Sequence, residues 1–169
     1  MIMNLYILRH GIAVEPGTPG YEKDADRPLT QDGERKLQQI AEAMEALELS
    51  FDLILSSPYL RARQTAEIVA EALKARKRLE LSDSLTPGGS TKKLVELLNR
   101  HQPSPENILL VGHEPYLSGL ISLLVAGDTT SAVTMKKGGL CKLSTESLKH
   151  GRCAALEWLL TPKQMALMS

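Results

Sequence analysis

Asn4-Leu5-Tyr6-Ile7-Leu8-Arg9-His10-Gly11 is the stretch on which the fold and the chemistry of this chain depend. Its apolar run has the length and the β-branched and aromatic content of a short buried strand. Two polar residues follow at once, and open α/β sheets bind their ligands in the crevice beyond the carboxyl ends of the strands. We therefore interpret His10 as a candidate nucleophile and Arg9 as a candidate phosphate clamp. The alternative is that both residues simply begin a solvated loop.

Helical and strand patterns alternate along the rest of the chain. Apolar spacing predicts helices at 30–47, 62–73, 91–99 and 117–124, and short apolar runs predict strands at 52–56, 79–81 and 107–111. Two late strands, 139–143 and 153–160, flank a polar segment typical of a hairpin loop, so we expect antiparallel pairing there. This order predicts a three-layer α/β/α sandwich with a mostly parallel sheet, built as a single domain over residues 1–169.

Composition limits the classes of partner. Lys plus Arg and Asp plus Glu are both 20, so the net charge is zero, which argues against nucleic acid or an anionic membrane as the main partner. No apolar run is long enough to span a bilayer, and the first residues lack the layout of a signal peptide. Cys141 and Cys153 are not in metal or redox spacing, so we expect reduced thiols in a cytoplasmic protein.

A second histidine follows a second buried strand. The predicted strand 107–111 is followed by Gly112 and His113, as the first is followed by His10. The carboxyl ends of parallel strands share one edge of a sheet, so the two histidines are predicted to converge. Arg61 lies early in a helix that begins at the same edge. We interpret the two other histidines, His101 and His150, as surface residues.

Three stretches resemble, in the same order, the motifs of a known family: Leu8-Arg9-His10-Gly11, Ser56-Ser57-Pro58-Tyr59-Leu60-Arg61-Ala62-Arg63-Gln64-Thr65-Ala66 and Val111-Gly112-His113-Glu114-Pro115. The family is the histidine phosphatase superfamily, also called phosphoglycerate mutase-like. The short length and Arg27-Pro28-Leu29-Thr30 make the chain most similar to its SixA-type protein phosphohistidine phosphatases. The resemblance implies the phosphoglycerate mutase-like sandwich, and phosphatase activity with no cofactor and no metal.

The resemblance also implies a role for each residue of the proposed site. His10 would attack phosphorus through a neutral ring nitrogen, with its other ring nitrogen held by a backbone carbonyl of the following loop. Arg9 and Arg61 would hold the phosphoryl oxygens, because a guanidinium binds them bidentately. His113 would donate a hydrogen bond to the same group. Arg63 points to another helix face and is predicted to be a surface charge.

Three further residues are weaker candidates for substrate binding. Gly11 would allow a close approach of the main chain to the ligand, or it is a plain turn glycine. Ser57 and Arg27 are candidate phosphate or substrate contacts. For these two residues, a helix-capping role or a surface ion pair is the competing interpretation.

Many members of this superfamily carry an acid that protonates the leaving oxygen, and this chain has no secure counterpart. Asp83 lies in the comparable stretch, and Glu114 and Glu15 are the other candidates. Without a positioned acid, an alkyl ester is a poor substrate, whereas the leaving nitrogen of a phosphoramidate is readily protonated. The sequence therefore favours phosphohistidine, as in a phosphotransfer domain, as substrate. The alternatives are a phosphatase for a small phosphorylated metabolite, a non-catalytic phosphate-binding module and a metal hydrolase.

Overall fold

The apolar run before His10 forms a central strand of a six-stranded sheet. The computed structural model describes residues 1–169 and orders the sheet β3-β2-β4-β1-β5-β6. Pairs within the first four strands are parallel, whereas β1–β5 and β5–β6 are antiparallel. The predicted mostly parallel sheet with late antiparallel strands is confirmed. The strands are β1 (Met3–Arg9), β2 (Leu53–Ser56), β3 (Leu79–Leu81), β4 (Asn107–Gly112), β5 (Leu140–Thr145) and β6 (Ala154–Leu160).

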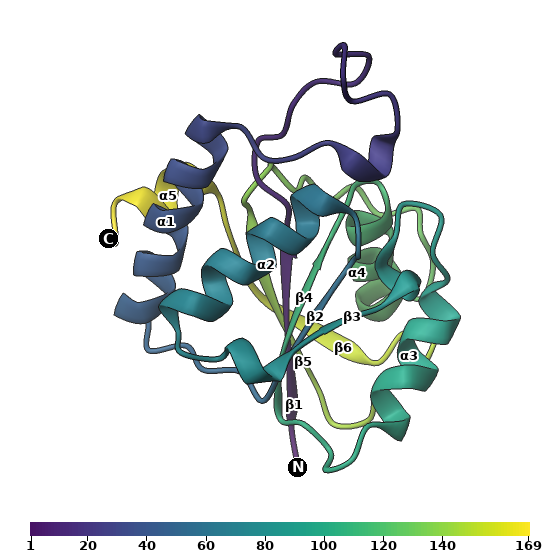
Figure 1. Cartoon of the computed structure of the whole chain (residues 1–169). Coiled ribbons are helices and arrows are strands. Elements are labelled where there is room, and N and C mark those ends of the chain that lie inside the picture. The colour runs from purple at the N-terminus through teal and green to yellow at the C-terminus, as the bar shows by residue number, and fades with distance from the viewer.

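Helices cover both faces of this sheet, which completes the predicted sandwich (Figure 1). Besides short 3-10 turns at η1 (Asp24–Asp26), η2 (Arg76–Arg78) and η3 (Asp83–Leu85), the helices are α1 (Gln31–Ala46), α2 (Leu60–Ala72), α3 (Thr91–Arg100), α4 (Tyr116–Ala126) and α5 (Pro162–Ala166). Thr30 caps α1 by accepting a hydrogen bond from the Gly33 amide, as its position predicts. The single turn of α5 is too short for apolar periodicity to predict it. No helix combines the length and the apolar character needed to cross a membrane.

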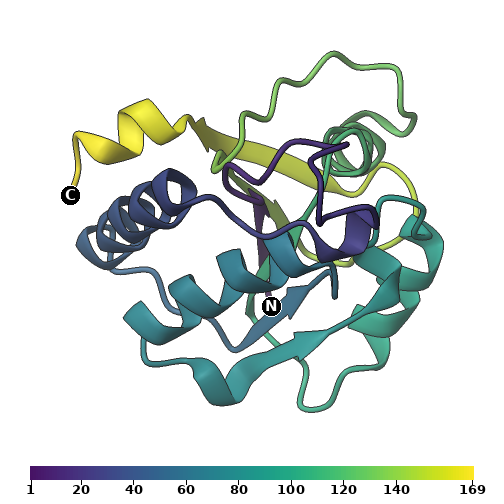
Figure 2. The same ribbon diagram turned by 45° about the horizontal axis from the view of Figure 1, so that its top comes forward.

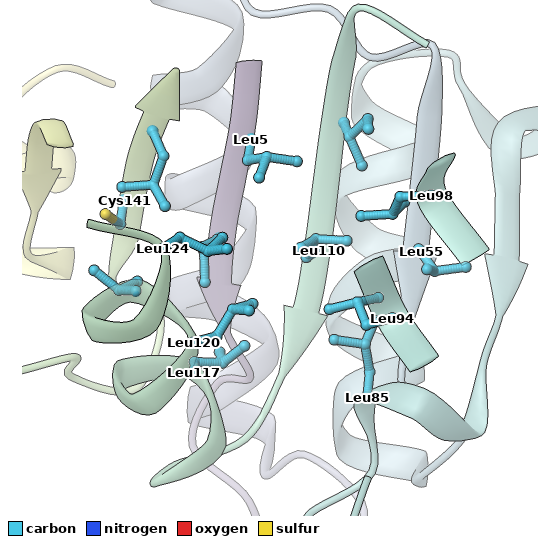
Figure 3. Close-up of a cluster of buried hydrophobic side chains, with 14 of the residues drawn as sticks. Leu5, Leu55, Leu85, Leu94, Leu98, Leu110, Leu117, Leu120, Leu124 and Cys141 are labelled. Atoms are coloured by element: carbon cyan, nitrogen blue, oxygen red, sulfur yellow. The ribbon is translucent and has the colours of Figure 1, made fainter. Parts of the chain in front are cut away.

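Alternation along β1 divides the core between the two faces of the sheet. Leu5 and Ile7 face a cluster that includes α3 and α4, whereas Tyr6 and Leu8 face a cluster that includes α1, α2 and α5. Figure 3 shows the first cluster, in which leucines of α3 and α4 lie against β1, β2 and β4. Because both faces are buried, the strand reads as continuously apolar rather than alternating.

The strand register places the candidate site residues at one edge of the sheet. Arg9 pairs with Gly112, and Ser56 pairs with Val111, so β1, β2 and β4 end together. His10, Ser57 and His113 are therefore each the first residue after one of these three aligned strands. The chain leaves this edge in a long loop, 12–28, which returns through η1 above the start of α2 (Figure 1).

Candidate active site

His10 lies buried immediately after β1, with 6% of its surface exposed. Its Nδ1 is 2.7 Å from the carbonyl oxygen of Gly11. A carbonyl only accepts hydrogen bonds, so Nδ1 carries the proton and Nε2 keeps a free lone pair. Nε2 accepts a hydrogen bond from Nε of Arg61 at 3.3 Å. The predicted fixing of the His10 tautomer by a backbone carbonyl is confirmed, and the lone pair of Nε2 points at a guanidinium.

His113 lies beside His10, as the matching strand ends predict. The two ring centroids are 5.2 Å apart, and Nε2 of His113 is 2.8 Å from Oγ of Ser57. That serine oxygen also accepts a hydrogen bond from the Tyr59 amide, so its proton is free to point at His113. Ser57 therefore orients His113, and its own hydroxyl lies within the site.

Burial keeps both histidines neutral in the free protein. Burial, helped by the charges of His113, Arg61 and Arg9, lowers the pKa of His10 to about 3, although the hydrogen bond to Gly11 opposes this shift. Burial, followed by the charge of Arg61, lowers the pKa of His113 to about 4. A neutral imidazole is the form that can attack phosphorus.

Two buried nitrogen atoms of the site have no hydrogen-bond partner within the protein. They are Nε of Arg9 and Nδ1 of His113, which are two of the three buried side-chain nitrogen or oxygen atoms without a hydrogen-bond partner. Buried polar groups are almost always paired, so an unpaired donor needs an explanation. A bound anion whose oxygens accept these hydrogen bonds would supply one. The guanidinium of Arg9 is itself held by a hydrogen bond from Nη1 to the carbonyl of Met135 at 2.9 Å.

Arg61 is held by a residue that the sequence does not single out, Asp24 of η1. Arg61 is only 4% exposed, and its Nη1 and Nη2 donate to the backbone carbonyl and to Oδ2 of Asp24 at 2.8 and 3.1 Å. Oδ1 of the same carboxylate accepts two hydrogen bonds from Arg27, at 2.9 and 2.7 Å. Arg27 therefore forms the ion pair of the competing interpretation, and Asp24 joins the 12–28 loop to Arg61.

Gly11 packs closely against the core of the protein. Its amide donates to Oγ1 of Thr65 at 3.1 Å, and a Cβ at this position would lie 2.2 Å from Cδ2 of Leu37. The close neighbour is therefore a core side chain of α1. The glycine lets the loop after β1 pack on that helix, which accounts for it within the protein itself.

The three candidate acids do not contact His10 or His113. Glu114 accepts hydrogen bonds from the amide and hydroxyl of Ser118, which commits it to the first turn of α4. Asp83 and Glu15 are exposed, and no hydrogen bond to either side chain is formed. Asp24 is the carboxylate at the site. Burial alone would raise its pKa, but hydrogen bonds from Arg27 and the charge of Arg61 outweigh that effect and lower it, so the carboxylate stays ionised.

The remaining charged candidates lie away from these side chains. Arg63 is exposed and pairs with Glu67, which confirms its predicted surface position. His150 is exposed and contacts Thr91, and His101 ends α3. No group of three or more His, Cys, Asp or Glu side chains has the arrangement of a metal site.

This chain is similar to known proteins both in sequence and in structure. The model of the histidine phosphatase superfamily (branch 1) matches residues 5–86. An uncharacterised protein of Picosynechococcus is 39% identical, over 83% of this chain and 84% of that protein. Phosphohistidine phosphatase SixA of Escherichia coli is 26% identical, over 95% and 94% of the two chains. A structure of the protein histidine phosphatase SixA complexed with tungstate superposes with a TM-score of 0.76 at 26% identity, covering 95% of this chain and 98% of that one.

Proposed function

This chain belongs to the histidine phosphatase superfamily, and from that premise we propose that it removes a phosphoryl group from phosphohistidine in a protein through a covalent phosphohistidine on His10. One observation carries the proposal above all. The unprotonated Nε2 of His10 accepts a hydrogen bond from Nε of the buried Arg61 at 3.3 Å. A nucleophile and a fixed cation are thus side by side where a phosphoryl group would enter. We further propose that residues 1–169 act as a single domain in the cytoplasm.

The proposed reaction has two steps, and both take place at Nε2 of His10. Nε2 of His10 attacks phosphorus and the P–N bond of the substrate breaks, so the leaving imidazole nitrogen takes up a proton. Water then attacks the phosphorus on His10, and the His10–phosphorus bond breaks to release inorganic phosphate. Arg9 and Arg61 neutralise the charge on the transferring oxygens, and His113 donates a hydrogen bond to them. In this proposal the chain's own cations supply the neutralisation, without a metal.

The ionised state of the Asp24 carboxylate favours a phosphoramidate over an alkyl ester as the substrate. It is the carboxyl group at the site, and its lowered pKa keeps it ionised, so it has no proton to give to a leaving alkoxide. An imidazole leaving group needs no such acid, because its nitrogen is basic enough to be protonated from solvent. This supports phosphohistidine ahead of a small phosphate ester. The presence of both His10 and His113 argues against a non-catalytic binding role.

The test compares kcat/KM for a phosphohistidine protein, an aryl phosphate and sugar phosphates, each with and without a chelator. We expect the phosphohistidine protein to be the best substrate, sugar phosphates the poorest, and the chelator to have no effect. A sugar phosphate turned over best would replace the proposal with a metabolite phosphatase. Chelator inactivation that a divalent metal restores would show that a metal takes part. Phosphate binding without any turnover would indicate the binding module.

A further inference from the structure

A groove of about 800 Å³ opens beside the phosphate clamp, and Arg9 forms part of its wall. Eleven residues line it, and none of them is an Asp or a Glu. Besides Arg9, four are lysines: Lys36, Lys136, Lys137 and Lys163. We call this feature the lysine groove.

The lysine groove is built from segments far apart in the sequence. Lys36 lies on α1, Lys136 and Lys137 lie in the segment before β5, and Lys163 lies on α5. Figure 2 shows α1 and α5 side by side, with the segment between α4 and β5 running toward them. Apolar side chains, among them Ile40, contribute to the lining between the cations. The groove therefore combines an apolar surface with cations from three directions.

The charges in the lysine groove are not balanced by the protein itself. Lys36 pairs with Asp32 at 3.2 Å, but Lys136, Lys137 and Lys163 are exposed and form no ion pair. The chain as a whole has zero net charge, so this gathering of like charge is local. A cleft lined by one sign of charge concentrates ligands of the opposite sign and raises their rate of association. The groove is thus suited to an anion that extends from the phosphoryl group held by Arg9.

We propose that the lysine groove binds the acidic segment that flanks the phosphohistidine of the protein substrate. This inference rests on the proposed function and adds the chemistry of the surface that is recognised. The proposed phosphate clamp uses the buried Arg61 and the partly buried Arg9, whose planar forks fit phosphate oxygens. The groove instead presents lysines, which are point charges on flexible stems and can follow carboxylates of variable position. Their exposure suits the carboxylates of a protein surface better than a second fixed phosphate.

The experiment measures binding of two labelled peptides, each with a non-hydrolysable phosphohistidine analogue, by fluorescence anisotropy. One peptide has glutamates around the analogue and its twin has glutamines. We expect the wild-type protein to bind the glutamate peptide about tenfold more tightly, since several exposed ion pairs add modest energies. A variant with Lys136→Gln, Lys137→Gln and Lys163→Gln should lose this preference and keep its affinity for the twin. Equal wild-type affinity for the two peptides would overturn the proposal.

A matched control removes the same charge elsewhere. Lys92→Gln, Lys93→Gln and Lys149→Gln change exposed lysines on or near α3, which lies across the sheet from α1 (Figure 1). This control should keep the preference, and loss in both variants would show a net-charge effect and reject the groove.

Replacing Lys136, Lys137 and Lys163 by Glu should invert the preference toward a peptide with flanking lysines. Hydrolysis of phosphoimidazole, which has no flanking segment, tests the proposed function separately from the groove.

Discussion

The candidate site is made from two regions that differ in burial and in how firmly their side chains are held. The floor consists of His10, Ser57, Arg61 and His113, which are buried and stand at strand ends or in the first turn of α2. The covering loop is 12–28, and it reaches the floor through Asp24, whose side chain is 52% exposed. The floor holds its groups in one geometry by burial and hydrogen bonds, whereas the loop adds a solvated charge. We infer that the floor performs the chemistry and that the loop adjusts how strongly the anion is held.

The sharpest test of the floor is removal of its nucleophile. The change His10→Ala leaves no ring nitrogen to attack phosphorus, so we expect phosphatase activity to fall by at least about 10³-fold, together with loss of labelling by a phosphorylated substrate. Single-turnover assays with labelled substrate measure both. Retained labelling would place the nucleophile elsewhere and break the assignment of chemistry to the floor.

Removing the cation of the floor should have the next largest effect. The change Arg61→Met deletes a buried guanidinium that faces Nε2 of His10, and we expect kcat to fall by about 10²- to 10³-fold, as for other fixed charge-stabilising donors. Arg63→Met is the matched control, because Arg63 is two residues away but exposed on the surface. Steady-state kinetics should separate the two variants. Equal losses would show that the helix needs positive charge in general rather than at this position.

Burial of the floor also predicts a dependence of stability on pH. The pKa values of His10 and His113 are lowered to about 3 and about 4, so between about pH 6.5 and pH 4 the unfolded chain binds more protons than the folded one. The free energy of unfolding should therefore fall as the pH decreases, by up to about 1.4 kcal/mol per pH unit for each histidine. Urea unfolding at several pH values measures the slope. A slope as steep in His10→Ala as in the wild type would contradict the assignment to His10.

The floor could be predicted from the sequence because each of its groups follows a regular element. A buried apolar run marks a strand, and strands that pair in parallel end at one edge, so the positions of His10 and His113 follow from local pattern alone. Arg61 follows in the same way from the start of a helix. The role of Gly11 does not follow, because it depends on a contact with Leu37 of a separate helix.

The covering loop and the lysine groove could not be predicted in this way. The 12–28 loop carries Glu15, Glu22 and Asp26 as well as Asp24, and no period or spacing selects the one that reaches Arg61. The lysines of the groove come from distant segments and meet because α5 packs on α1 and because the segment before β5 reaches the end of β1. Such contacts are set by tertiary packing, which the order of residues along one segment does not contain.

The smallest expected effect concerns the carboxylate that the covering loop places against Arg61. In Asp24→Asn the backbone carbonyl still holds Nη1 of Arg61, so the guanidinium should keep its place while a negative charge beside the anion is lost. Because this carboxylate is half exposed, solvent screening limits the gain, and we expect inorganic phosphate to inhibit about threefold more strongly with kcat little changed. Asp26→Asn, in the same turn, is the control. If kcat for an aryl phosphate fell more than about tenfold in Asp24→Asn alone, Asp24 would be acting as an acid, and the chemistry would belong to the loop as well as to the floor.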